Sequence, residues 1–109
     1  MAKQIDMFVE AEDRKLFADL SEIGICMIQP FIDNLPSEPY ITVSDIKLCF
    51  NNIFSNSGKG FSESNVYRWL DAGLIHELPV QSGEKDEKKR HMIFRASFLS
   101  LIKSRINAI

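Results

Sequence analysis

The sequence predicts a mostly helical α+β fold that contains a single two-stranded β-hairpin. Apolar residues recur at spacings of three and four in several segments, as they do on one face of a helix. Two short β-prone segments, near residues 75–80 and 91–95, flank a polar stretch that contains Gly83. The run Pro36-Ser37-Glu38-Pro39 interrupts regular structure. We therefore expect an acidic, amphipathic helical arm over residues 1–36 and a second domain over residues 40–109.

The N-terminal arm is expected to form one helix over residues 10–29. Its apolar positions follow a helical pattern and include Leu16, Phe17, Leu20, Ile23, Ile25 and Met27. Pro30 either ends this helix or lies in the first turn of a short continuation over residues 31–35. The apolar face can pack on the second domain or on another copy of the chain. We favour the second alternative, a homodimer through this helix.

The second domain is expected to begin with an extended segment over residues 40–43, followed by a helix. Ser44 is a good N-cap residue, and Asp45 suits the positive end of a helix. The apolar face of this helix consists of Ile46, Cys49, Phe50, Ile53 and Phe54. Residues 56–60 form a turn because they are rich in Asn, Ser and Gly.

A short second helix is expected after this turn. Ser62 or Ser64 is its N-cap, and Gly73 ends it as a C′ residue. Its core-facing positions are Val66, Trp69 and Leu70, so that Tyr67, Arg68 and Asp71 point away from the core.

The chain is expected to end with the hairpin and a last helix. The hairpin has strands over residues 75–80 and 91–95, the second with Met92 and Phe94 on one face. Ser97 caps the last helix, whose apolar stripe is Phe98, Leu101, Ile102 and Ile106. The order of helix, turn, helix, hairpin and helix is that of a winged helix-turn-helix, here with an extra N-terminal helix.

The charge is divided unevenly along the chain. The net charge is −2 overall, but residues 1–40 carry −5 and residues 41–109 carry +3. No acidic residue follows Lys88. Such asymmetry suggests a polyanion as the partner of the basic half. A further hypothesis is that the acidic arm shields the basic surface when this polyanion is absent.

The second helix and the hairpin together predict a site for double-stranded DNA. A helix that lies in the major groove contacts base edges and phosphates through its polar side chains. A basic hairpin beside such a helix can lie against the DNA backbone or in a minor groove. The candidate DNA-binding residues are Lys59, Ser62, Ser64, Asn65, Tyr67, Arg68, Lys85, Lys88, Lys89 and Arg90.

Residues 40–46, 61–74 and 90–99 resemble the MerR-like helix-turn-helix domains, and most closely their excisionase-type subgroup from phages and conjugative elements. The centre of the resemblance is Val66-Tyr67-Arg68-Trp69-Leu70, followed by the Gly73 cap. The connection over residues 51–60 is longer than usual in that family, and Glu84, Asp86 and Glu87 dilute the charge of the hairpin tip. The resemblance implies a recombination directionality factor of a mobile element, which bends DNA and positions a site-specific recombinase. The alternatives are a small transcriptional regulator and a protein–protein interaction module that does not bind DNA.

Other classes of function have no support in the sequence. Cys26, Cys49, His76 and His91 match no metal-ligand spacing, and residues 56–60 lack the spacing of a phosphate loop. No nucleophile stands in a recognisable catalytic arrangement, so we expect neither an enzyme nor a cofactor. No apolar run is long enough to span a membrane, and no signal peptide is recognisable. We expect a cytoplasmic, nucleoid-associated protein with two reduced, buried cysteines.

Overall fold

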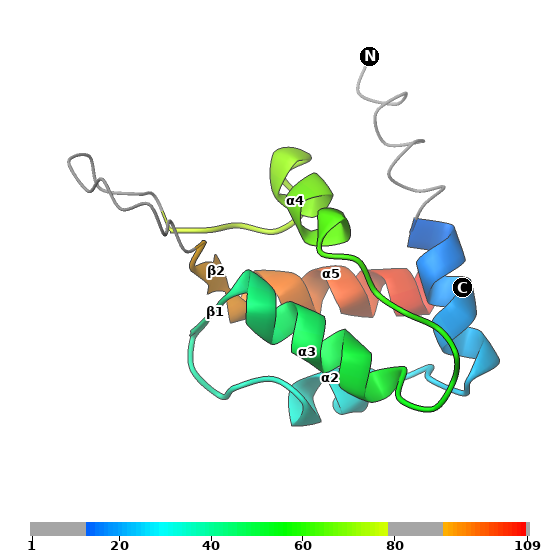
Figure 1. Cartoon of the computed structure of the whole chain (residues 1–109). Helices are drawn as coiled ribbons and strands as arrows, with labels where there is room; N and C mark the ends of the chain where they lie inside the picture. Colours follow the sequence, from blue (N-terminus) through cyan, green and yellow to red (C-terminus); the bar gives the residue numbers. More distant parts are fainter. Residues whose placement is uncertain (1–12, 79–90, 109) are drawn as a thin grey trace, which may run out of the picture.

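The computed structural model of the chain describes residues 13–78 and 91–108 as a mostly helical fold with a small antiparallel sheet (Figure 1). A helix over residues 13–22, called the N-terminal helix below, comes first. It is followed by α2 (Gln29–Asp33), β1 (Tyr40–Ile41), α3 (Val43–Ile53), α4 (Ser64–Asp71), β2 (Ile93–Phe94) and α5 (Arg95–Ala108). The mostly helical α+β class is therefore confirmed. In the described ranges, no helix combines the length and hydropathy needed to cross a bilayer.

The prediction of one helix over residues 10–29 is wrong at its C-terminal end. Gly24 adopts a left-handed φ of 86°, and the Ile25 amide donates to the Leu20 carbonyl at 2.9 Å. A residue in this left-handed conformation commonly ends a helix, and glycine is favoured there because it has no Cβ atom. The chain then turns into α2, which has Pro30 in its first turn. Cys26 lies in the turn and is exposed, so the expectation that it is buried is also wrong.

The N-terminus of α3 is capped by Thr42 rather than by Ser44. The Thr42 hydroxyl accepts a hydrogen bond from the Asp45 amide at 3.1 Å, and the Asp45 carboxylate accepts one from the Thr42 amide at 2.9 Å. This reciprocal pair forms a capping box. The helix starts at Val43 because Thr42 and Asp45 have the required spacing of three, which leaves Ser44 exposed in the first turn.

The ends of α4 and α5 also differ in part from expectation. Gly73 has φ 74° and ends α4, as predicted, whereas Glu63 occupies the N-cap position without a capping hydrogen bond. Ser97 lies inside α5 instead of capping it. The Ser97 hydroxyl donates to the Phe94 carbonyl at 2.8 Å and accepts from the His76 amide at 3.0 Å. It therefore ties the sheet to the first turn of α5.

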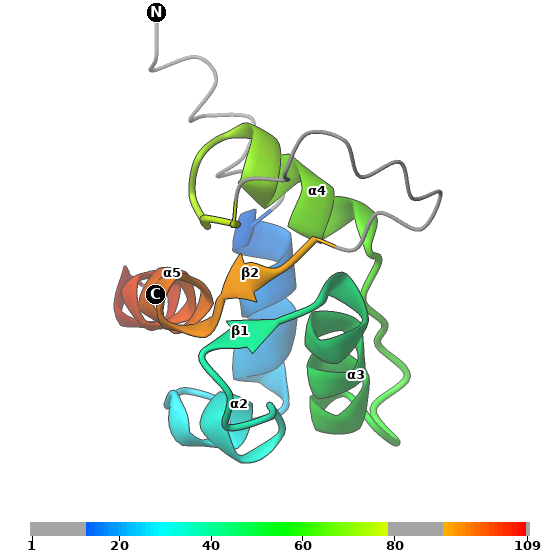
Figure 2. The same cartoon turned by 90° about the vertical axis from the view of Figure 1, so that its left-hand side faces the viewer.

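The sheet lies between α3 and α5 (Figure 2). β1 pairs antiparallel with β2, in the register Tyr40↔Phe94 and Ile41↔Ile93. On the other side of β2, residues 76–78 run antiparallel to residues 92–94, with a bridge between Glu77 and Ile93. The two predicted strands are thus paired where the structure describes them, and residues 79–90 lie outside the described ranges. Met92 and Phe94 are both half-buried, and between them Ile93 is fully buried in the core.

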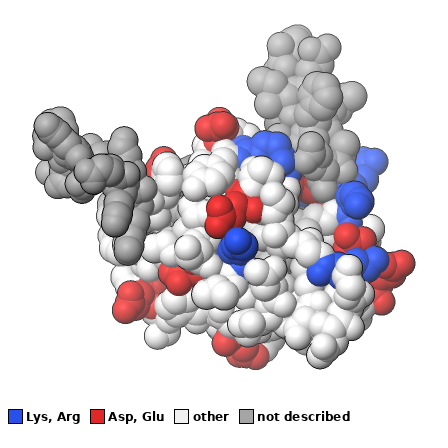
Figure 3. Space-filling model, in the orientation of Figure 1, with Lys and Arg blue, Asp and Glu red and all other residues white. Residues whose placement is uncertain are grey.

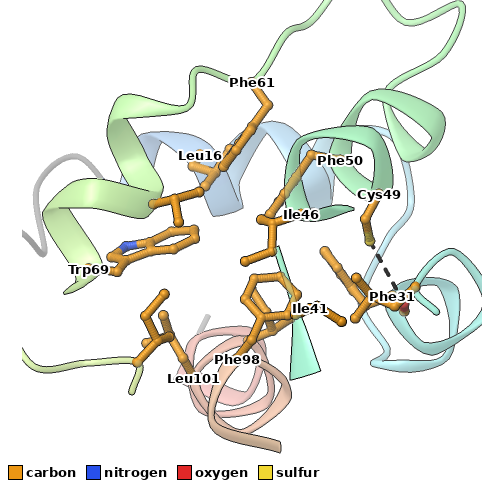
Figure 4. Close-up of a cluster of buried hydrophobic side chains, with 14 of the residues drawn as sticks. Leu16, Phe31, Ile41, Ile46, Cys49, Phe50, Phe61, Trp69, Phe98 and Leu101 are labelled. Carbon is orange, nitrogen blue, oxygen red and sulfur yellow. Dashed lines mark hydrogen bonds between the residues drawn. The ribbon is translucent and has the colours of Figure 1, made fainter. Parts of the chain in front are cut away.

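One hydrophobic core joins the N-terminal helix to all later helices (Figure 4). Phe50 lies near its centre. The centroid of the Phe50 ring is 4.0 Å from that of Phe61, 5.3 Å from that of Phe31 and 6.3 Å from that of Trp69. Each fully buried aromatic side chain of this size contributes roughly 2–3 kcal/mol of transfer free energy. Apolar residues on both sides of the segment 36–39 belong to this core, so the described part of the arm folds against residues 40–109.

The apolar face of the N-terminal helix is buried within the chain. Leu16, Phe17 and Leu20 are members of the same core. This is the first of the two packing alternatives given above. The main reason for expecting a homodimer through this helix therefore no longer applies, since Leu16, Phe17 and Leu20 are already covered, although Met27 at the end of the predicted stripe is 60% exposed.

Candidate nucleic-acid interface

The helix α4 turns a polar face away from the core. Val66 and Trp69 are fully buried and anchor the helix. On the other side Ser62 and Ser64 are exposed, Asn65 is half-buried, and 43% of the Tyr67 surface is accessible. This division follows from the i, i+3 spacing of the two anchors. The prediction is confirmed for Val66 and Trp69, which are buried, and for Tyr67 and Asp71, which are exposed, whereas Leu70 and Arg68 are both half-buried.

Hydrogen bonds order the polar side chains along this face. The Arg68 guanidinium donates through Nη2 to Oδ1 of Asn65. The Asn65 amide in turn donates to the Ser62 carbonyl at 3.2 Å, and the hydroxyls of Ser62 and Ser64 lie 2.9 Å apart. Arg68 is half-buried. Asn65 and Arg68 thus form a coupled pair, and a change in one alters the orientation of the other.

His91, which stands just before β2, contacts α4 directly. The His91 ring meets the Tyr67 ring edge-on, with centroids 5.5 Å apart. The Nδ1 atom of His91 lies 2.5 Å from Oε1 of Glu77 in the neighbouring segment. His91 is thereby held between Glu77 and the exposed face of α4. The candidate residues Lys85, Lys88, Lys89 and Arg90 lie outside the described residues, with Arg90 preceding His91 directly in the sequence.

Lys59, in the connection before α4, is paired with acids of the N-terminal helix. Its Nζ atom lies 2.6 Å from Oε1 of Glu22 and 3.5 Å from Oδ1 of Asp19. The hydrogen bond to Glu22, together with the charges of Asp19 and Glu22, raises the pKa of Lys59 above its usual 10.5. Lys59 is therefore fully charged at neutral pH, but its charge is already compensated within the chain.

A hollow of about 410 Å³ lies between the N-terminal helix and the start of α4. It collects three of the candidate residues from the α4 side and a base and an acid from the N-terminal helix. The lining consists of Lys15, Leu16, Asp19, Gly60, Ser62, Ser64 and Asn65. The N-terminal helix is thus a neighbour of the candidate interface, which the sequence analysis did not foresee.

The charges around the candidate interface are mixed. Figure 3 shows basic and acidic side chains interspersed over this face of the molecule. For example, the Nζ atom of Lys47 in α3 lies 3.7 Å from Oε2 of Glu63. The sequence did not reveal these partners, because each pair joins residues of different elements. The one available signal was the spacing of three between Asp19 and Glu22, which places both acids on one helical face.

A buried carboxylate fixes α4 against its neighbours. Asp13 is only 2% exposed. Its Oδ1 accepts a hydrogen bond from the Trp69 indole at 2.9 Å, and its Oδ2 accepts one from Nε of Arg105 at 2.9 Å. The same carboxylate therefore links the N-terminal helix, α4 and α5, and helps to set the position of the polar face described above.

The described residues hold no group of three or more His, Cys, Asp and Glu side chains placed to bind a metal ion. Cys49 is buried and its Sγ lies 3.7 Å from the Phe31 carbonyl (Figure 4). Comparisons of the chain with models of protein families, with curated proteins and with solved structures found no match.

Proposed function

We propose that this protein binds double-stranded DNA in a sequence-specific manner, with α4 in the major groove. The observation that carries the proposal is the contact between Tyr67 and His91. It joins the exposed polar face of α4 to the point where the chain leaves the basic run Lys88–Arg90. A helix that reads base edges and an adjacent cationic segment that contacts phosphates are the two parts that such binding requires.

The two parts have different tasks in this proposal. Once they exchange their bonds to each other and to the Ser62 carbonyl for bonds to bases, Asn65 is suited to adenine, to which an amide can donate and from which it can accept, and Arg68 is suited to guanine. Lys85, Lys88, Lys89 and Arg90 contact the DNA backbone and supply affinity for any sequence. Ser62 and Ser64 lie at the start of α4, where hydroxyls and backbone amides meet a phosphate.

The biological role proposed with this activity is that of a recombination directionality factor, which places DNA for a site-specific recombinase in the cytoplasm. A small transcriptional regulator would use the same surface. The bend of the bound DNA, which gel mobility of circularly permuted fragments measures, tests the recombination role. Straight DNA contradicts that role and leaves the regulator, whereas a strong bend agrees with both because regulators also bend their sites.

The test begins with selection of bound sequences from random duplex DNA, followed by titration at several salt concentrations. The double variant Lys88→Ala/Lys89→Ala is expected to weaken binding to all sequences alike. The salt dependence of log K should become shallower by about 0.9 for each phosphate that the variant no longer neutralises. Lys103→Ala is the charge-matched control for Lys88→Ala and Lys89→Ala taken singly, because Lys103 is an exposed base of α5, remote from the polar face of α4.

The variants Asn65→Ala and Arg68→Ala are expected to relax the sequence preference instead. Each should cost roughly 1–3 kcal/mol on the selected site and little on other DNA. Because Arg68 donates to Asn65, the effect of the double variant should be smaller than the sum of the two single effects. Binding that no variant of either kind alters would contradict the proposal.

A protein–protein interaction module on this scaffold is the second candidate function. It is favoured by the compensation of Lys47 and Lys59 by Glu63, Asp19 and Glu22, which leaves less positive charge for a polyanion. Failure to select any DNA sequence at low salt would favour this candidate.

A further inference from the structure

The ion pairs of Lys59 join two segments that lie far apart in the sequence. Lys59 precedes α4, whereas Asp19 and Glu22 belong to the N-terminal helix. That helix is held in place by Phe17 and Leu20 in the core and by the contacts of Asp13 with Trp69 and Arg105. The two carboxylates are therefore presented to Lys59 by a fixed helix.

Asp19 also lines the hollow beside the start of α4, together with Ser64 and Asn65. A DNA phosphate that approached these two side chains would meet the Asp19 carboxylate within the same hollow. Like charges at this range repel each other, and the repulsion is stronger at low salt. Asp19 thus opposes a phosphate at the place where the proposed interface needs one, against the attraction of Lys15 in the same hollow.

We propose that Asp19 and Glu22 are built-in competitors for DNA phosphate, and that they lower the affinity of this protein for all DNA sequences by holding Lys59 within the chain. The inference rests on the proposed function. On DNA of the selected sequence, the contacts of α4 outweigh this competition. Because the competition concerns a phosphate contact that every sequence offers, it lowers the affinity for the selected site and for other DNA by the same factor and leaves the sequence preference unchanged.

The proposal requires Lys59 to exchange its two carboxylate partners for a DNA phosphate, and the exposure of these side chains allows that exchange. The side chains of Lys59, Asp19 and Glu22 are 29%, 26% and 66% exposed. Ion pairs with this much access to water change equilibria by at most about fivefold each. The lysine ammonium sits on a flexible four-carbon stem, so it can turn from the carboxylates to a phosphate without a movement of the backbone.

The experiment compares two double variants that both raise the net charge by two. Asp19→Asn/Glu22→Gln removes the competing carboxylates. Asp33→Asn/Glu38→Gln is the control, since both of its acids are exposed and lie in or after α2, at the opposite end of the molecule from α4 (Figures 1 and 2). Removal of the whole helix is not a usable test, because it would take Leu16 and Phe17 out of the core.

The first variant is expected to bind every duplex about two- to tenfold more tightly at low salt, with a salt slope steeper by about 0.9, the value for one additional neutralised phosphate. The control variant should show neither change. In a Lys59→Gln background, Asp19→Asn/Glu22→Gln should raise the DNA affinity only by the amount due to the lost repulsion between carboxylate and phosphate. The additional steepening of the salt slope should disappear.

The outcomes separate this inference from the proposed function. If the unaltered protein binds DNA and the two double variants behave alike, the competition is refuted and the DNA-binding proposal stands. Binding by Asp19→Asn/Glu22→Gln, with none by the unaltered protein, would support both. If no variant binds DNA at low salt while all keep their helical circular dichroism, both proposals fail.

Discussion

Replacing Asp13 with alanine should destabilise this protein by about 2 kcal/mol. The carboxylate accepts hydrogen bonds from the buried Trp69 indole and from Arg105. Alanine removes both acceptors at once. The indole then becomes a buried donor without a partner, and the guanidinium loses its counter-charge.

The magnitude follows from the exposure of the two donors. Trp69 is fully buried, so an unpaired indole N–H costs about 1–3 kcal/mol. The Arg105 side chain is 23% exposed and can regain water, so its loss adds at most about 1 kcal/mol. Removal of the desolvated carboxylate offsets part of this cost. Asp13→Asn keeps an acceptor for the indole and should cost about half as much or less.

Urea unfolding measures the effect by two probes. Trp69 is the single tryptophan of the chain, so its fluorescence reports on the site while circular dichroism reports on the helices. For a chain of this size, a loss of 2 kcal/mol moves the unfolding midpoint by about 1–2 M urea. Asp33→Ala, an exposed acid, is the control and should stay within about 0.5 kcal/mol of the unaltered protein. A loss below 0.5 kcal/mol for Asp13→Ala would refute the reasoning.

Three further predictions concern the two cysteines and Gly73. Burial raises the pKa of the Cys49 thiol from 9.0 to about 12, so above pH 9.0 the unfolded chain releases a proton that the folded protein keeps. The contribution of the Cys49 thiol to the free energy of unfolding is complete below pH 9.0 and is lost towards pH 12. Over this range, the free energy of unfolding of the unaltered protein should fall more steeply with pH than that of Cys49→Ala, by about 1.4 kcal/mol per pH unit. An equal pH dependence of the two proteins would contradict this. A thiol reagent at pH 8 should label Cys26 alone in the folded protein. Gly73→Ala should cost about 1–2 kcal/mol in thermal unfolding because of the positive φ of 74°. Gly60→Ala, also with free space at Cβ but without a positive φ, should be neutral or slightly stabilising, and equal losses at both sites would exclude backbone strain as the cause.

Local periodicity predicted the core-facing positions well. Val66 and Trp69 of α4, and Phe98 and Ile102 of α5, are fully buried where the spacing placed them. At these positions the amphipathic pattern is a property of a few consecutive turns, so it can be recognised without knowledge of the remaining chain.

Predictions failed where two local signals competed. The apolar residues Ile23, Ile25 and Met27 continued the pattern of the first helix, but Gly24 between them adopts the left-handed conformation that ends it. Met27 consequently lies 60% exposed in the turn. In the same way Ser44 is a good cap by type, but only Thr42 stands three residues before an acid that can complete the capping box.

The environment of the candidate site could not be predicted from local pattern at all. Asp13 bonds residues 56 and 92 positions away, and Lys59 pairs with acids some 40 positions earlier in the chain. A charged residue on an amphipathic helix is ordinarily solvated, so nothing in the sequence marked Asp13 as buried. Such contacts depend on how the helices are arranged in three dimensions.

The shared core limits how this chain can be divided or recombined. Leu20 and Phe31 lie before the proline-rich break, yet they cover the same interior as Phe50 and Phe98. A fragment that starts at residue 40 would expose the large apolar surface that these residues cover. It would also lack the Asp13 carboxylate, which accepts a hydrogen bond from the Trp69 indole. The helices and the sheet of residues 40–109 therefore cannot be transferred to another protein as a separate unit. A change in the N-terminal helix also alters the packing of α4.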